Sequence, residues 1–139
     1  MNMTRRQAIA FGASAAIVLG LPLSAHAALI DEAIAAFTGG AETSEGGVDL
    51  TAPEIAENGN TVPIAVSADG AISITILAAG NPNAEVITFN FGPLAGSRSA
   101  STRIRLAQTQ DLIAIAKMED GSFKMTSQTV KVTIGGCGG

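Results

Sequence analysis

The chain of 139 residues has no tryptophan, no tyrosine, a single histidine and a single cysteine. The histidine, His26, stands near the amino terminus, so residues 28–139 contain none. That part of the chain therefore lacks the base of a Ser-His-Asp or Cys-His arrangement, and a metal site in it would need carboxylates and one thiol. A lone cysteine also excludes an internal disulfide. These absences argue against an autonomous enzyme and against a metal or cofactor site.

The first 27 residues have the pattern of a signal peptide. Arg5 and Arg6 precede the apolar run Ala8–Leu23, and residues 25–27 (Ala-His-Ala) form a small-x-small cleavage site. Glycine, serine and proline make the run too mildly apolar for a transmembrane helix. The arginine pair is typical of Tat export, although the residues after it depart from the Tat pattern, and a Sec signal is the alternative. We expect a periplasmic protein, exported by the Tat route, with no membrane anchor.

The exported chain is expected to be acidic. Removal of residues 1–27 leaves 112 residues, enough for one domain, with six of the eight basic residues against all twelve acidic ones and a net charge of about −6. An acidic domain offers no electrostatic footprint for nucleic acid or an anionic membrane. Arg98, Arg103 and Arg105 could favour an anion, but solvated strand positions explain them more simply.

Residues 28–47 precede the strand-like part of the chain. The spacing of Ile30, Ile34 and Phe37 predicts a short amphipathic helix. Two acidic residues would stand in its first turn, where the helix dipole favours them, and glycines 39 and 40 would end it. The rest, up to residue 47, is predicted to be a flexible, glycine-rich connection. The helix could lie on the domain or reach across to a partner.

Residues 48–134 alternate between apolar and polar side chains, in runs separated by turn residues. We expect six or seven strands, at residues 48–50, 62–66, 72–76, 86–91, 100–106, 111–118 and 123–134. Pro63 marks the second run as an edge strand, and Asp120 before Gly121 predicts a tight hairpin. The fold class is therefore all-β, an immunoglobulin-like antiparallel β-sandwich.

Two features of this domain remain open. The five phenylalanines are its only aromatic residues, so the core is thin; a partner subunit covering one sheet and a self-sufficient domain both fit. The turn Asn58-Gly59-Asn60 either touches a partner or simply turns the chain.

The chain ends in Gly135-Gly136-Cys137-Gly138-Gly139. Glycines on both sides of the thiol predict a flexible arm, whose five residues span roughly 17 Å when extended. Cys137 has no basic residue within five positions, and the terminal carboxylate beside it disfavours the thiolate, so we expect partners to activate it. Valine at Gly136 and Gly138 is expected to leave the fold unchanged and to slow loading of the arm.

The terminal Gly-Gly-Cys-Gly-Gly, residues 53–63 (PEIAENGNTVP) and the twin-arginine leader together resemble the SoxY family. The resemblance implies a sulfur-carrier subunit of the periplasmic thiosulfate-oxidising Sox system, an immunoglobulin-like domain in a heterodimer with a SoxZ-like subunit. It implies that Cys137 is the site of covalent sulfur attachment.

The resemblance also implies transient partners. A SoxAX-like c-type cytochrome would join thiosulfate to Cys137 oxidatively, a SoxB-like hydrolase would release sulfate, and a sulfane dehydrogenase would oxidise the remaining sulfur. The protein would then be a covalent substrate carrier and not an enzyme, with no catalytic base, metal or cofactor of its own.

Two alternatives come from other classes of protein. Ubiquitin-like sulfur carriers also end in Gly-Gly, but they are cytosolic, and the leader argues against that class. A structural periplasmic module tethered through an intermolecular disulfide at Cys137 is the second alternative.

Overall fold

The computed structural model describes residues 24–136, and in this range the chain forms one α-helix and nine β-strands. The elements are α2 (Ser24–Thr38), β1 (Thr43–Glu45), β2 (Asp49–Thr51), β3 (Ile55–Asn58), β4 (Val62–Ser67), β5 (Ala71–Ala78), β6 (Glu85–Asn90), β7 (Ser99–Ile104), β8 (Gln110–Met118) and β9 (Phe123–Ile134).

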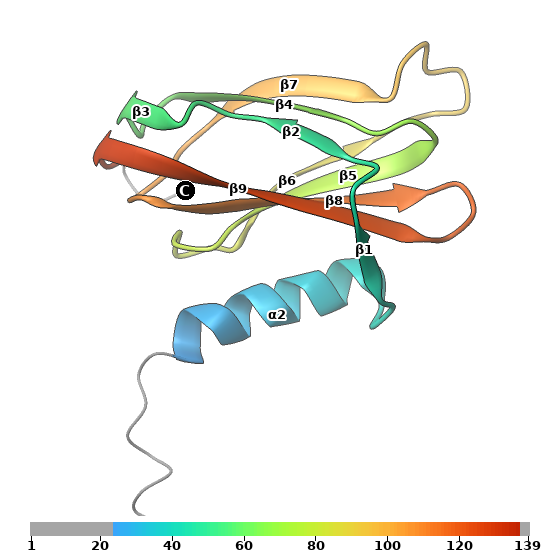
Figure 1. The fold of residues 1–139 in the computed structure, drawn as a ribbon, viewed down its shortest axis with the longest axis horizontal. Coiled ribbons are helices and arrows are strands. Elements are labelled where there is room, and N and C mark those ends of the chain that lie inside the picture. Colours follow the sequence, from blue (N-terminus) through green and yellow to red (C-terminus); the bar gives the residue numbers. More distant parts are fainter. Residues whose placement is uncertain (1–23, 137–139) are drawn as a thin grey trace, which may run out of the picture.

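The strands form two sheets that face each other (Figure 1). The larger sheet has the order β1-β9-β8-β5-β6, with β3 also paired to β9, and the smaller sheet has the order β2-β4-β7. This arrangement confirms the predicted immunoglobulin-like β-sandwich with a short helix before it. Most pairs are antiparallel, as predicted, but β1 and β3 both run parallel to β9.

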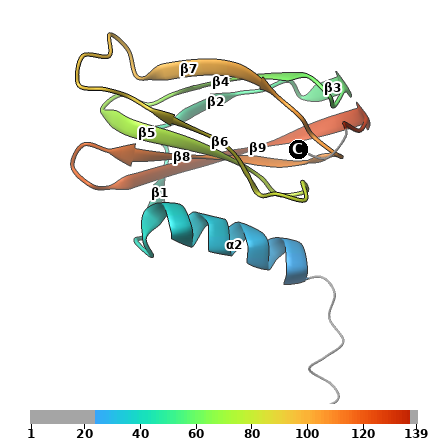
Figure 2. The same ribbon diagram turned by 180° about the vertical axis from the view of Figure 1, so that it is seen from behind.

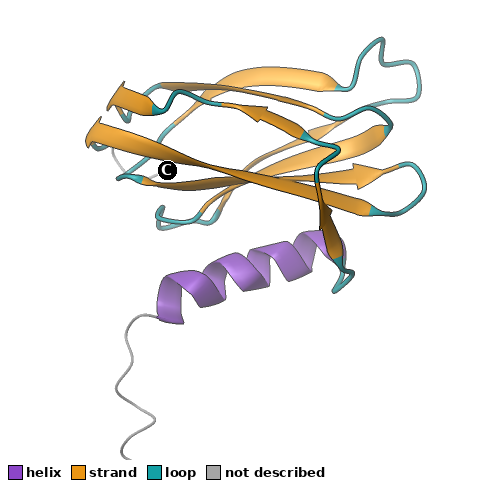
Figure 3. Ribbon diagram, viewed as in Figure 1, coloured by secondary structure: helices purple, strands orange, loops and turns teal. Residues whose placement is uncertain are grey.

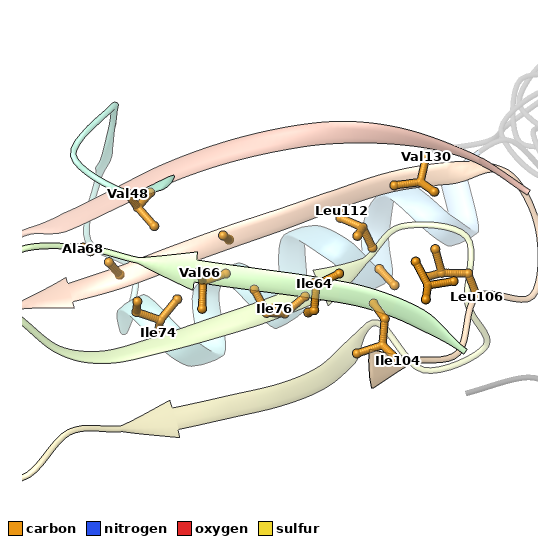
Figure 4. Packing of buried hydrophobic residues seen from close by; sticks show 14 of the residues in the cluster. Val48, Ile64, Val66, Ala68, Ile74, Ile76, Ile104, Leu106, Leu112 and Val130 are labelled. Carbon is orange, nitrogen blue, oxygen red and sulfur yellow. The ribbon is translucent and has the colours of Figure 1, made fainter. Parts of the chain in front are cut away.

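The main core lies between the two sheets. Figure 4 shows side chains from β4 reaching toward those of β5 and β8, with Leu106 and Ile104 at one end of the cluster. Aliphatic residues fill it, because the inward-facing positions of each strand carry them in alternation. The largest members with no exposed surface are Val62, Ile74, Ile76, Leu106, Leu112 and Val130.

Helix α2 packs on the outer face of the larger sheet and makes a third layer (Figure 3). Its residues Ile30 and Ala33 are buried against Leu77 of β5 and Ile115 of β8. Phe37 meets Phe123 edge to face, with ring centroids 5.9 Å apart. The helix therefore lies on its own domain, which was one of the two possibilities left open by the sequence.

The helix ends where the sequence predicts but begins earlier. Gly39, with φ of 67°, closes it through a hydrogen bond from its amide to the carbonyl of Ala35. Alanines before residue 29 are strong helix formers and extend it back to Ser24. Asp31 and Glu32 are consequently in the middle of the helix, so the expectation of acids in the first turn is wrong.

Two of the strands, β1 and β3, fall where the sequence predicts no strand. They are three and four residues long and mostly exposed, so neither has an apolar alternation that a sequence pattern could reveal. β1 pairs with Phe123–Met125 along the edge of β9 opposite β8, and β3 pairs with residues 131–134 of β9, beyond the last residue paired with β8. Both strands therefore use backbone groups of β9 that β8 leaves unpaired. The connection expected at residues 39–47 therefore contains a strand.

Strand β4 is the middle strand of the smaller sheet, and its prediction as an edge strand is wrong for most of its length. The effect of Pro63 is nevertheless visible. Strand β2 pairs only with Ala65, Val66 and Ser67 of β4, whereas β7 pairs with all six residues. At Pro63 the strand has one neighbour, so the missing amide breaks no pairing with β2.

The expectation of half-buried strands is also wrong for β5, because its second face is buried too and packs against helix α2 at Leu77. Ser73, Thr75 and Leu77 on that face are all buried. Ile72, on the face expected to be apolar, is 37% exposed, at a point where the register with β8 shifts. A bulge of this kind changes which way a side chain points, and no sequence pattern marks it.

The β8–β9 connection is the predicted Asp-Gly hairpin. Gly121 has φ of 86°, and the Asp120 carboxylate accepts hydrogen bonds from the Ser122 hydroxyl at 2.6 Å and the Ser122 amide at 2.9 Å. These hydrogen bonds lower the pKa of Asp120 below its ordinary value of 3.8.

We predict that Leu112→Ala lowers the free energy of unfolding by about 3 kcal/mol, because it leaves a cavity between the sheets. Leu94→Ala is the matched control, since Leu94 is 98% exposed and Leu112 is fully buried. Urea unfolding of both variants measures the difference. Equal losses of stability would mean that the core does not lie where the fold puts it.

Candidate functional site at the base of the arm

The predicted attachment site, Cys137, lies outside the described residues, together with Gly138 and Gly139. The described part of the expected arm is Gly135 and Gly136, which follow β9 directly. The geometry of the site is therefore the geometry of the arm's base. Figures 1 and 2 show the end of β9 beside β3, at the opposite end of the sandwich from the β8–β9 hairpin.

Three backbone hydrogen bonds join the base of the arm to two other segments. The amide of Gly59, after β3, donates to the carbonyl of Ile134 at 2.7 Å, and its carbonyl accepts from the amide of Leu106 at 2.7 Å. The carbonyl of Leu106, after β7, in turn accepts from the amide of Gly136 at 2.8 Å. The hydrogen bonds form a closed ring through the end of β9, the turn after β3 and the β7–β8 loop.

The backbones at this ring approach one another so closely that Gly59, Gly135 and Gly136 have no room for a side chain. A Cβ on Gly59 would lie 2.7 Å from the Gly136 nitrogen and overlap the Leu106 carbonyl oxygen. A Cβ on Gly136 would lie 2.6 Å from the Gly59 oxygen, and one on Gly135 would overlap the Ala107 oxygen. None of the three is among the glycines with positive φ. Close approach, and not an unusual torsion, is what requires glycine here.

We call the backbone of Gly59, Leu106 and Ala107 the arm clamp. It corrects two expectations from the sequence. Gly135 and Gly136 are expected there to belong to a flexible arm, yet both contact the clamp. Valine at Gly136 is expected to leave the fold unchanged, which is wrong, because its Cβ would collide with the backbone of Gly59. The Asn58-Gly59-Asn60 turn, left open by the sequence, meets the base of the arm.

A buried amide network holds the β7–β8 side of the clamp. Asn81, 2% exposed, donates from Nδ2 to the Arg105 carbonyl at 2.9 Å, and its Oδ1 accepts from the Ala107 amide at 3.0 Å. The same Oδ1 accepts from Nε2 of Gln110 at 2.8 Å. Asn81 thus bonds to the residues on either side of Leu106, whose side chain is fully buried. In the sequence, residues 80–83 simply lie between two predicted strands, since no pattern marks a buried asparagine.

Three findings on the described residues bear on what the domain could bind. No three histidine, cysteine, aspartate or glutamate residues in the described range 24–136 lie close enough together to hold a metal ion. Arg98 pairs with Glu119 at 3.3 Å, and Arg103 donates to the Thr61 hydroxyl at 3.3 Å, so these two arginines have partners within the chain. In the same range, no helix is long and apolar enough to cross a membrane.

Comparison with known proteins identifies the family. A family model described as "Sulfur oxidation protein SoxY" matches residues 34–137, a range that includes Cys137. The solved structure of the sulfur carrier protein SoxY from Chlorobium limicola f thiosulfatophilum is 35% identical, with a TM-score of 0.68, and the match covers 78% of this chain and 99% of that one. This chain belongs to the SoxY family.

More distant matches share the fold alone. A superoxide reductase (neelaredoxin) from Ignicoccus hospitalis is 16% identical, with a TM-score of 0.55, over 63% of this chain and 80% of its own. A superoxide reductase described as putative, from Thermotoga maritima, is 18% identical, with a TM-score of 0.53, over 69% and 89%. No curated protein sequence matches the chain. SoxY membership therefore carries the functional argument.

We predict that Asn81→Ala lowers the free energy of unfolding by about 3 kcal/mol, because it removes three hydrogen bonds of a buried side chain, to the Arg105 carbonyl, the Ala107 amide and Nε2 of Gln110. Asn83→Ala is the control, since Asn83 is exposed in the same loop. Urea unfolding of both variants gives the two values. A loss at Asn81 no greater than that at Asn83 would contradict the role of the network.

Proposed function

We propose that this SoxY-family protein carries sulfur intermediates of thiosulfate oxidation covalently on Cys137 and presents them to partner enzymes. The observation that carries the proposal is the single thiol of the chain, within the range of the SoxY match and directly after a glycine held at the edge of the domain. The relative from Chlorobium limicola is itself described as a sulfur carrier protein.

The first step of the proposed cycle is oxidative. The thiol of Cys137 and thiosulfate form a sulfur–sulfur bond, giving a cysteine S-thiosulfonate and releasing one proton and two electrons. The thiol and the sulfane sulfur are oxidised, and a SoxAX-like c-type cytochrome accepts the electrons. Water then cleaves the sulfane–sulfonate bond at a SoxB-like hydrolase, which releases sulfate and leaves a persulfide on Cys137. A sulfane dehydrogenase oxidises that remaining sulfur.

The carrier supplies attachment and presentation, and its partners supply the catalytic groups. Residues 28–139 contain no histidine that could deprotonate Cys137, and Lys131, six positions before it, is the nearest basic residue in the sequence. The base, metal or redox centre is then provided in trans when a partner binds the arm. This division suits a substrate that visits several enzymes in turn, since each needs a different chemistry at the same sulfur.

A SoxZ-like subunit is the proposed stable partner, in a heterodimer. Two apolar features support a protein partner: Ile55 of β3 is 60% exposed, and Ala52, Pro53 and Pro63 line a shallow, mainly apolar hollow. Exposed apolar surface of this kind is typical of protein interfaces. The domain is proposed to bind neither nucleic acid nor membranes, in keeping with its acidic charge.

The proposed location is the periplasm, reached through the signal peptide of residues 1–27. Thiosulfate chemistry on a single thiol also suits an oxidising compartment.

We predict that the native protein from cells grown on thiosulfate carries sulfur or thiosulfonate adducts on Cys137 that mild reduction removes. Intact mass, measured with and without thiosulfate and before and after reduction, identifies them. Cys137→Ser is the control and is expected to show no adduct and to abolish thiosulfate oxidation. A bare thiol in wild type, or a disulfide homodimer under both conditions with function retained in Cys137→Ser, would favour the tethered module.

We predict that replacing both Arg5 and Arg6 by lysine blocks export, because the Tat pathway requires the arginine pair. Immunoblots of periplasmic and cytoplasmic fractions measure it, with the mature amino terminus expected at Ala28. Unchanged export of the double variant would point to a Sec signal, and an uncleaved amino terminus would overturn the signal peptide.

A further inference from the structure

The arm clamp determines the point at which the chain leaves the domain before Cys137. If the arm were free from Gly135 onward, the three residues 135–137 could carry the Cα of Cys137 roughly 10 Å from the last strand. Gly136, however, donates to the Leu106 carbonyl and lies against the backbone of Gly59. Covalent geometry then puts the Cα of Cys137 about 3.8 Å from the Cα of a held residue.

We propose that Gly59 is a positioning residue for Cys137: through the arm clamp it holds the residue before the cysteine, so that the thiol is presented from one fixed point at this end of the sandwich. The inference rests on the proposed carrier role of Cys137 and adds where partner enzymes must approach, which is the end formed by β3 and the β7–β8 loop.

Three observations on the described residues carry the proposal. Gly59 is buried and takes part in two of the three hydrogen bonds of the ring, one to β9 and one to Leu106. The contact is backbone against backbone at Gly59, Gly135 and Gly136, and a methyl group at any of them would collide with main-chain atoms. The two backbones in such a contact cannot shift relative to each other without a clash, because there is no side chain that could change its rotamer to make room.

The clamp is also held rigidly on the side away from the arm. Leu106 has a fully buried side chain, and Asn81 bonds to the residues before and after it. When a methyl group is added at Gly136, the segment after β9 is therefore the part that can move, and the β7–β8 loop is not. A methyl group at Gly59 would meet both the Leu106 carbonyl and the Gly136 nitrogen, so it separates the turn after β3 from both of its neighbours.

The test uses the single cysteine of the chain as the site for a methanethiosulfonate nitroxide label. In wild type we expect an electron paramagnetic resonance spectrum with a slow component. In Gly136→Ala and in Gly59→Ala we expect the rotational correlation time of the label to fall at least about twofold, because the held residue is released. Gly96→Ala is the matched control, since a Cβ at Gly96 has no atom within 4 Å. In this variant the mobility of the label on Cys137 should equal that in wild type.

Amide hydrogen exchange separates positioning from stability. In Gly136→Ala we expect protection of the residue 136 amide to fall at least about tenfold, while the amide of buried Val130 in β9 keeps its protection within about twofold. If Gly59→Ala does not fold, Gly136→Ala still tests the proposal, because residue 136 lies after the last strand. A loss of protection shared equally by Val130 would indicate a structural role alone and overturn the positioning role.

The result that would overturn the inference is a label as mobile in wild type as in both variants. This outcome is distinguishable from failure of the proposed function, which is read from the mass of Cys137. A slow label without sulfur adducts would leave the clamp standing and remove the carrier role. Sulfur adducts on Cys137 together with a fast wild-type label would support the carrier role and overturn the positioning role of Gly59.

Discussion

The backbone pairing of strand β9 is the interaction on which the rest of this fold depends. Its twelve residues pair with β8 from Phe123 to Val130, with β1 near its beginning and with β3 near its end. Its buried side chains serve both cores, Val130 between the sheets and Phe123 beneath the helix. Because the proposed carrier cysteine follows this strand so closely, every pairing that fixes β9 also fixes where the arm begins.

The end of β9 shows how the fold serves the proposed chemistry. A carrier thiol must reach the active sites of several enzymes, so it needs a short, narrow segment, which glycine provides. It must also start from a defined place, because an unanchored tail dilutes the thiol over a large volume. At Gly135 and Gly136 the same absence of a Cβ meets both requirements, since it permits the close contact with the Gly59 and Ala107 backbones.

Much of the fold could be predicted from the sequence, and the failures have specific physical causes. The alternation in residues 62–66 and 111–118 and the Asp120-Gly121 turn are local signals, and they predicted strands and a hairpin that the structure has. The parallel strands β1 and β3 were missed because three or four mostly exposed residues carry no periodic signal. The burial of Leu77 was missed because helix α2, which packs against it, is distant in sequence.

For the candidate site, the sequence by itself determined the chemistry. One thiol, glycines around it and no histidine in residues 28–139 are the features on which the proposed carrier role rests, since reactivity depends on which atoms are present. Only the tertiary structure decided what the glycines do. Gly59, Gly135 and Gly136 read as a turn and a flexible tail, and the buried Asn81 as part of a loop. Their contacts join segments far apart in the chain, and no local pattern records how closely two backbones will pass.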